Sequence, residues 1–156
     1  AEKGSAYACY NAAVLLTKGG GSGEGRGEEG HEEEREKVNN EKAAKLYVKA
    51  ALAGHRRAQY VLGSLYERGV MMPQSDESAY EWYKKAADSG HAGGLHKLAV
   101  FKMEGRGGMA VSKKEAFALL MSAAEQGHIP SKHSVALSYL AGDGVKKKRE
   151  EGGAVV

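Results

Sequence analysis

Residues 49–69 read KAALAGHRRAQYVLGSLYERG, and the Gly-His pair within this stretch occurs three times in the chain. The pair stands at 54–55, 90–91 and 127–128, so successive copies are 36 and 37 residues apart. Two consecutive alanines lie just ahead of the glycine in every copy. A phrase that returns at a period of this length predicts a repeat protein, in which each copy is one supersecondary unit.

Two helical patterns alternate around the Gly-His pairs. Ahead of each pair, small and apolar residues recur at offsets of 3, 4, 7 and 8, which place them on one side of a helix that we name helix B. A second pattern, helix A, follows each pair. The B patterns span 43–54, 79–90 and 116–127, and the A patterns span 8–19, 58–69, 94–105 and 131–142. The sequence therefore predicts seven helices in the order A, B, A, B, A, B, A.

The ends of these helices carry residues suited to helix termini. Glycine adopts the left-handed conformation of a helix C-terminus at little cost. The glycines that we expect to end helices are Gly19, Gly54, Gly69, Gly90, Gly105, Gly127 and Gly142. The expected caps of the B helices are Asn39 or Asn40, Ser75 or Asp76, and Ser112, which forms a capping box with Glu115.

Gly63 lies in the middle of an expected helix A, where glycine costs about 1 kcal/mol relative to alanine. The equivalent positions hold Ala13, Ala99 and Ala136, all of them small. A position that stays small in each copy indicates close contact between the backbone and the paired helix. We expect the double alanine of helix B to supply the facing surface.

These residues resemble the Sel1-like repeat family, an α–α solenoid related in geometry to tetratricopeptide repeats. The resemblance rests on AQYVLGSLYERG at 58–69 and ESAYEWYKKAADSGH at 77–91. Lys102 and Ser138 depart from the family pattern, which prefers Tyr and Leu at those positions. The resemblance implies an all-α fold, a right-handed superhelix (solenoid) of about three and a half helix-turn-helix repeats that forms a single domain over residues 1–156.

The first connection between a helix A and a helix B is longer than the others. Gly19 and Gly69 are 50 residues apart, whereas Gly69 and Gly105 are 36 apart. The extra residues are rich in Gly and Glu, a composition that buries too little apolar surface to order itself. We therefore expect a mobile insertion at 19–38.

Composition and charge exclude several classes of protein. The net charge of +3 is too small and too dispersed for the concentrated basic face of a nucleic-acid-binding protein. No stretch approaches the roughly 20 apolar residues of a membrane-spanning helix, so no membrane insertion is expected. Cys9 is the single cysteine, which excludes an intrachain disulfide framework. No targeting segment is visible, which favours a cytoplasmic location.

No catalytic, cofactor-binding or metal-ligating arrangement emerges from the sequence, so we expect no enzyme, cofactor or metal site. His55, His91 and His128 repeat at a structural joint, which predicts hydrogen bonding at helix ends rather than catalysis. Some cysteine-rich members of the Sel1-like family are associated with β-lactam binding or hydrolysis. Their paired cysteines are absent here, so a hydrolase is kept only as an alternative.

A stripe along the A helices is the candidate partner-binding face. The likeness to tetratricopeptide geometry implies that this stripe lines the concave side of the superhelix, where peptides dock. Its residues are Tyr10, Val14, Tyr60, Ser64, Glu67, His96, Val100, Met103, His133 and Leu137. The alternative is that Tyr60 and its equivalents simply pack between successive A helices.

The repeats favour a scaffold or adaptor that binds a protein or peptide partner on this concave face, because stacked repeats present an extended surface. A purely structural segment of a longer solenoid is the alternative. The pattern at 131–142 has no B helix after it, and solenoid ends normally need a polar cap. End-to-end self-association is therefore a further alternative.

Overall fold

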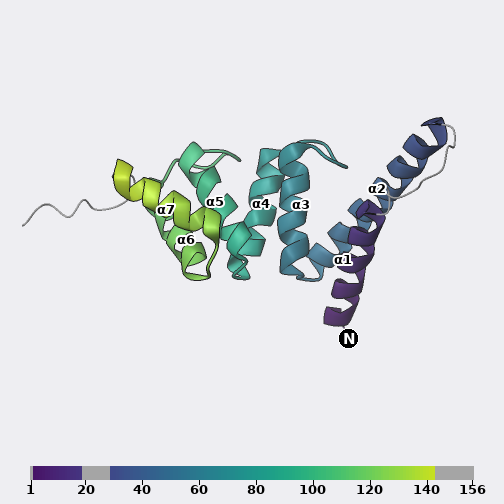
Figure 1. The fold of residues 1–156 in the computed structure, drawn as a ribbon, viewed down its shortest axis with the longest axis horizontal. Helices are drawn as coiled ribbons and strands as arrows, with labels where there is room; N and C mark the ends of the chain where they lie inside the picture. Colours follow the sequence, from purple (N-terminus) through teal and green to yellow (C-terminus); the bar gives the residue numbers. More distant parts are fainter. Residues whose placement is uncertain (1, 19–28, 143–156) are drawn as a thin grey trace, which may run out of the picture.

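A computed structural model describes residues 2–18 and 29–142, and this part of the chain contains seven helices and no strand (Figure 1). The helices are α1 (Glu2–Lys18), α2 (Glu29–Leu52), α3 (Arg56–Arg68), α4 (Asp76–Asp88), α5 (Ala92–Glu104), α6 (Lys113–Glu125) and α7 (Ile129–Ala141). The A helices are α1, α3, α5 and α7, and the B helices are α2, α4 and α6. The predicted all-α repeat fold is confirmed.

Each helix packs mainly against its neighbours in the chain. Figure 1 shows the helix pairs side by side in one row, from α1 and α2 at one end to α7 at the other. The buried apolar side chains accordingly form a series of clusters along the row rather than one central core. This arrangement is that of a solenoid, in which each repeat is stabilised by the repeats on either side.

The double alanines of the B helices face the first small residue of the next helix A. Ala50 and Ala58 are fully buried in one cluster at the joint between α2 and α3. At the next joint a Cβ on Gly94 would lie 2.9 Å from the Cβ of Ala86 and 2.9 Å from the backbone nitrogen of Ala87. Small residues on both helices therefore allow the two backbones to approach.

Gly63 is small for a different reason from the one that we expected. A Cβ at this position would lie 2.7 Å from Cδ1 of Tyr83, whose side chain is fully buried. The facing surface is thus the aromatic ring of the following helix B and not the double alanine, so this part of the prediction is wrong. The ring lies directly against the backbone of α3, which leaves no room for a side chain there. Ala13 and Tyr47 share a cluster in the same way.

Helix α2 begins at Glu29, well ahead of the cap expected at Asn39 or Asn40. Residues 29–38, which we expected to be mobile, are helical, so the prediction is wrong for them. Residues 30–38 are exposed. Glu, Lys and Arg are strong helix formers, and extending a helix that is already packed avoids the cost of nucleation. Figure 1 shows this part of α2 projecting beyond the other helices. Residues 19–28 of the expected insertion lie outside the described residues.

The expected helix-ending glycines have the predicted conformation wherever the structure describes them. Gly69 is the C-cap of α3 with φ 65° and ψ 35°, and its amide donates to the carbonyl of Leu65. Positive φ angles also occur at Gly54, Gly90, Gly105, Gly127 and Gly142. Gly19 lies outside the described residues.

The serine caps are confirmed, with one difference. Ser75, rather than Asp76, caps α4, since its Oγ accepts from the amide of Ser78 at 3.2 Å. Ser112 Oγ accepts from the amide of Glu115 at 3.3 Å, as a capping box requires. Glu115 does not complete the box, because its carboxylate accepts from Nζ of Lys102 at 2.7 Å.

Candidate partner-binding face

The Gly-His pairs place a histidine at the start of three A helices. His55 and His91 are the N-caps of α3 and α5, and in each case Nδ1 accepts a hydrogen bond at 3.1 Å from the amide three residues on. His128 precedes α7 and lies 2.8 Å from Oγ of Ser131 through Nδ1, without a bond to the backbone. The predicted hydrogen bonding at helix ends is confirmed.

One row of the candidate face packs against these histidines, and Tyr10 and Tyr60 stack on theirs. The ring pairs are Tyr10–His55, Tyr60–His91 and His96–His128, with centroid separations of 4.6, 4.8 and 5.2 Å. Each pair joins an A helix to the start of the next one, so these rings do pack between successive A helices. Tyr10, Tyr60 and His96 are only half-buried. The exposed part of each ring is the part that our prediction assigns to a partner.

The other face positions follow the same helices. Val14, Ser64, Val100 and Met103 are half-buried on α1, α3 and α5. His133 and Leu137 are exposed on α7, the last described helix of the row. The exposure of the candidate residues thus increases at α7.

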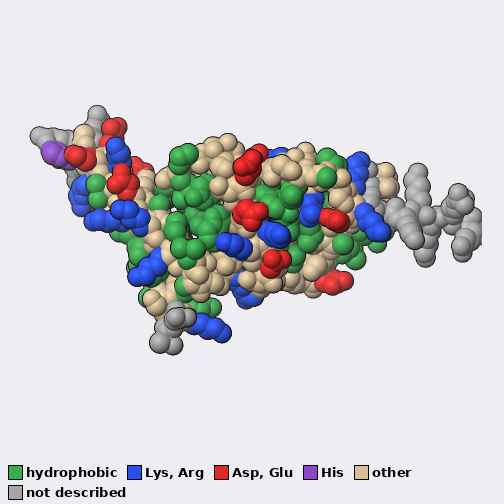
Figure 2. All heavy atoms as spheres, turned by 180° about the vertical axis from the view of Figure 1, so that it is seen from behind, with side chains coloured by type: hydrophobic (Ala, Val, Ile, Leu, Met, Phe, Trp, Pro, Cys, Tyr) green, Lys and Arg blue, Asp and Glu red, His purple; other side chains and the backbone are tan. Residues whose placement is uncertain are grey.

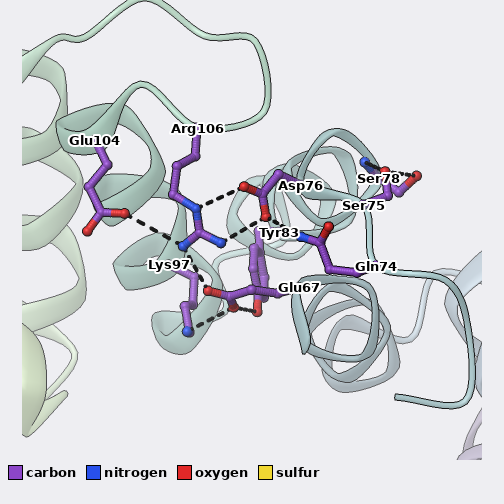
Figure 3. A network of polar contacts seen from close by, with 9 residues as sticks. All are labelled: Glu67, Gln74, Ser75, Asp76, Ser78, Tyr83, Lys97, Glu104 and Arg106. Atoms are coloured by element: carbon purple, nitrogen blue, oxygen red, sulfur yellow. Dashed lines mark hydrogen bonds and ion pairs between the residues drawn. The ribbon is translucent and has the colours of Figure 1, made fainter. Parts of the chain in front are cut away.

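Glu67 differs from the other face residues because its carboxylate is used within the molecule (Figure 3). It accepts hydrogen bonds from the hydroxyl of Tyr83 at 2.5 Å, from Nζ of Lys97 at 2.9 Å and from Nη1 of Arg106 at 3.1 Å. Its side chain is only 13% exposed. Burial raises the pKa of this carboxyl, but the three donors outweigh burial and lower the pKa of Glu67 below its usual value. Glu67 is therefore held ionised between two repeats.

Arg106 extends this network to the start of α4. Its Nη2 and Nε donate to the two carboxylate oxygens of Asp76 at 2.8 and 3.1 Å, a bidentate pair. The hydrogen bond from Arg106 lowers the pKa of Asp76. The guanidinium also lies 4.3 Å from the ring centre of Phe101. Arg106 thereby ties α3, α4 and α5 together.

The sequence did not reveal this network, because its members are distant in the chain and each resembles an ordinary surface charge. The one signal in the sequence is the residue that follows the helix-ending glycine of a helix A. It is Arg106 after Gly105, whereas the equivalent residue after Gly69 is the apolar Val70. Figure 2 shows acidic and basic side chains interleaved with hydrophobic ones on one face of the row. Charged side chains in such an interleaved pattern can stabilise the fold as readily as they can form a binding site.

Among the histidines of the candidate face, His96 has the contacts that most resemble a catalytic arrangement. Within the described residues its ring lies near a hydroxyl group and has no acidic partner. Its Nε2 lies 3.4 Å from Oγ of Ser134, which donates to the carbonyl of Pro130 at 3.0 Å. In the described part of the chain, no three His, Cys, Asp or Glu residues are grouped so that they could hold a metal ion. Among the helices of residues 2–18 and 29–142, none combines the length and apolarity of a membrane span.

Two substitutions of His91 distinguish its contribution as an N-cap from its contribution as a ring that stacks on Tyr60. His91→Ala is expected to lower the unfolding free energy by about 1–2 kcal/mol, because it removes both an N-cap and the contact with Tyr60. His91→Asn keeps a good capping side chain and should lose less. Urea unfolding followed by circular dichroism measures both. Equal losses in the two variants would show that the cap contributes little.

The pH dependence of stability gives a second measurement of how His91 stabilises the fold. Burial, followed by the charges of Arg56 and Arg57, lowers the pKa of His91 below its usual 6.5. A depressed pKa means that the neutral ring stabilises the fold fully above about pH 6.5 and that this stabilisation is lost as the pH falls below it. The His91→Asn variant should show a weaker loss between pH 7 and pH 5 than the wild type.

The repeat frame of the structure coincides with that of a known family. The Sel1 repeat family model matches residues 27–55, 56–91, 92–128 and 131–152. This chain belongs to the Sel1 repeat family. The two central matches begin at the first residue of α3 and of α5 and end at the cap histidine of the following helix A. A Sel1 unit here is therefore one helix A, one helix B and the next cap.

Two curated relatives of this Sel1 repeat chain are named as regulators. The chitin synthase regulator SKT5 of Saccharomyces cerevisiae is 40% identical over 82 residues, which are 51% of this chain and 11% of that protein. Chitin synthase regulatory factor 2 of Schizosaccharomyces pombe is 30% identical over 97 residues, which are 60% of this chain and 19% of that protein. The chain thus spans less than a fifth of the length of either relative.

Solved structures show the same fold. A Sel1 repeat protein from Oxalobacter formigenes has a TM-score of 0.72 at 31% identity, covering 91% of this chain and 52% of that one. A protective antigen of uropathogenic Escherichia coli strains with an SLR fold has a TM-score of 0.75 at 30% identity, covering 91% and 27%. Helicobacter pylori cysteine rich protein B, at 18% identity and a TM-score of 0.58, covers 84% and 95% and shares the fold alone.

Sel1 repeat proteins generally mediate protein–protein interaction.

Proposed function

We propose that this chain is an adaptor that binds a partner protein or peptide along the face formed by its A helices. The observation that carries the proposal is the contrast between constant packing and variable face positions. The row that starts at Tyr10 and Tyr60 continues as His96 and His133, while the small packing positions stay Ala or Gly. A constant scaffold with a variable surface presents a distinct pattern of groups to one partner.

We further propose that this binding serves regulation, with the chain forming the part of a regulatory protein that contacts its target. The names of the two curated relatives support this role. In both of them the regulated enzyme, by name, is a chitin synthase. A chitin synthase of the native source is therefore the first partner to test.

The face can be tested at exposed positions, so that the fold is left intact. The His133→Glu/Leu137→Glu double variant lowers the net charge by two, counting histidine as neutral. Lys84→Glu, exposed on α4, lowers it by two on a helix B and serves as the control. Affinity purification from the native source with quantitative mass spectrometry should recover the partner with the wild type and the control. The double variant should recover it about tenfold less.

Equal recovery by all three proteins would contradict the assignment of the face. A second candidate, a structural segment within a longer solenoid, is favoured by exposed apolar side chains on α7, among them Leu140, which is 85% exposed. In the same purification, recovery of further copies of this chain and of no other protein would support that candidate instead.

A further inference from the structure

A cavity of about 670 Å³ is lined by the joint between α2 and α3 and by the N-terminal half of α1. Its volume falls within the range of ligand-binding pockets. The side chains that give it its character are Lys3, Tyr7, Tyr10, His55, Arg56 and Arg57. The cavity therefore combines aromatic rings with three cationic groups.

The aromatic rings form one continuous wall of the cavity. Tyr10 stacks on His55 with 22° between the ring planes, and Tyr7 meets the same histidine edge-on, 4.5 Å between ring centres. Tyr7 is nevertheless 61% exposed. A tyrosine ring that is held in place and still exposed offers a rigid contact surface, and Tyr and Arg are the residue types that often dominate binding energy in interfaces.

Among the described residues, the cations at the cavity have no opposite charges beside them. No acidic residue is among the residues that line it. Within the described part of the chain no carboxylate pairs with Lys3, Arg56 or Arg57. After burial, the charges of the two arginines are the next cause that lowers the pKa of His91, so their field reaches the adjoining joint. Over the part of the chain that the structure describes, the cavity thus carries three cationic groups with no carboxylate paired to them.

The position of the two arginines opposes the stability of their own helix. Arg56 and Arg57 occupy the first turn of α3, where positive charge acts against the helix dipole and no acidic residue offsets it. The same positions hold Ala92 and Gly93 at the next joint, and neutral residues again at the start of α7. A local cost that occurs at one joint only is typical of a functional site.

We propose that this cavity binds an acidic peptide segment of the partner protein, an inference that rests on the proposed adaptor function. Two carboxylates of the segment pair with Arg56 and Arg57, because a guanidinium matches a carboxylate in a bidentate geometry. An adjacent apolar side chain packs on Tyr7 and Tyr10. A nucleic acid fits less well, since it requires a continuous basic stripe rather than three cations around one cavity.

The test uses a short fluorescent peptide that is acidic except for a central leucine, and a counterpart with Asn and Gln in place of Asp and Glu. The Arg56→Gln/Arg57→Gln variant removes two positive charges at the cavity. Arg68→Glu changes the net charge by the same amount at the far end of α3, where the side chain is exposed. Fluorescence anisotropy measures the affinity, and ¹H–¹⁵N NMR shifts locate the bound peptide.

We expect the acidic peptide to bind the wild type and Arg68→Glu alike and the double glutamine variant about tenfold or more weakly. Shifted amides should include those of Tyr7, Tyr10 and His55, and the amide counterpart should not bind. Thermal unfolding should show the double variant to be no less stable than the wild type, because the removed charges oppose the dipole of α3.

Absence of binding by the acidic peptide, or equal binding by the double glutamine variant, would overturn the proposal. Tighter binding of inorganic phosphate or of a short oligonucleotide in parallel titrations would overturn it in favour of another anion. If the peptide fails while partner recovery still depends on His133 and Leu137, the adaptor function stands without this cavity. If both fail, both proposals fall.

Discussion

The Tyr83→Ala variant is expected to lose about 3–5 kcal/mol of unfolding free energy, the loss typical of deleting a buried aromatic side chain. Tyr83 is fully buried, and its ring lies against the backbone of Gly63 and edge-on to Phe101, 5.6 Å between ring centres. Glycine has no side chain that could move into the vacated space, so the cavity should persist. Urea unfolding followed by far-ultraviolet circular dichroism measures the loss.

Tyr83→Phe is the matched control, because it keeps the ring and removes only the hydroxyl that donates to Glu67. We expect it to cost about 1–2 kcal/mol, since Glu67 retains its bonds to Lys97 and Arg106. Similar losses in the two variants would mean that the hydroxyl, and not the packed ring, stabilises this repeat. A loss below about 1 kcal/mol in Tyr83→Ala would contradict the packing argument.

The helix frame could be predicted because its signals are local and repeated. Gly54 and His55 illustrate this: one residue ends α2 with a positive φ, and the next caps α3. Both roles depend on a few neighbouring residues, so the positive φ recurs at Gly90 and Gly127 and the cap to the backbone recurs at His91. Ser75 and Ser112 were predictable for the same reason.

The features that the sequence did not reveal depend on tertiary contacts or on continuity with a packed helix. The partner of Gly63 is the ring of Tyr83, twenty residues away and on another helix. The N-terminal part of α2 is helical although its composition suggests disorder, because it continues a packed helix. Composition indicates how much apolar surface a segment can bury, but it does not show whether the segment continues a helix that is already packed.

The candidate face was predictable as a set of equivalent positions, but the contacts of its side chains were not. Tyr10 and Tyr60 stack on the cap histidines because each helix A lies beside the start of the next one. The cavity with Arg56 and Arg57 exists because α1 lies beside the joint that carries them. In both cases the repeat period gives the positions, and the packing of successive repeats determines which atoms meet.

Replacing Glu67 tests whether this face residue acts in the fold. Glu67→Gln should lower the unfolding free energy at pH 7 by roughly 2–3 kcal/mol. This is less than for a fully buried ion pair, because Lys97 and Arg106 are about a third exposed. The hydroxyl of Tyr83, Lys97 and Arg106 outweigh burial and lower the pKa of Glu67. The ionised carboxylate therefore stabilises the fold fully above its unfolded pKa of about 4.5, and this stabilisation is lost as the pH falls below that value.

The wild type should accordingly lose stability between pH 5 and pH 3 more steeply than Glu67→Gln, a difference that urea unfolding at several pH values measures. Glu104→Gln is the matched control, since Glu104 contacts the same Arg106 at 3.6 Å but is 55% exposed. An exposed pair of this kind contributes about 0–1 kcal/mol, so the control should follow the wild-type profile closely. A parallel profile for Glu67→Gln and the wild type would refute the structural role. Glu67 would then again be a candidate residue for binding a partner.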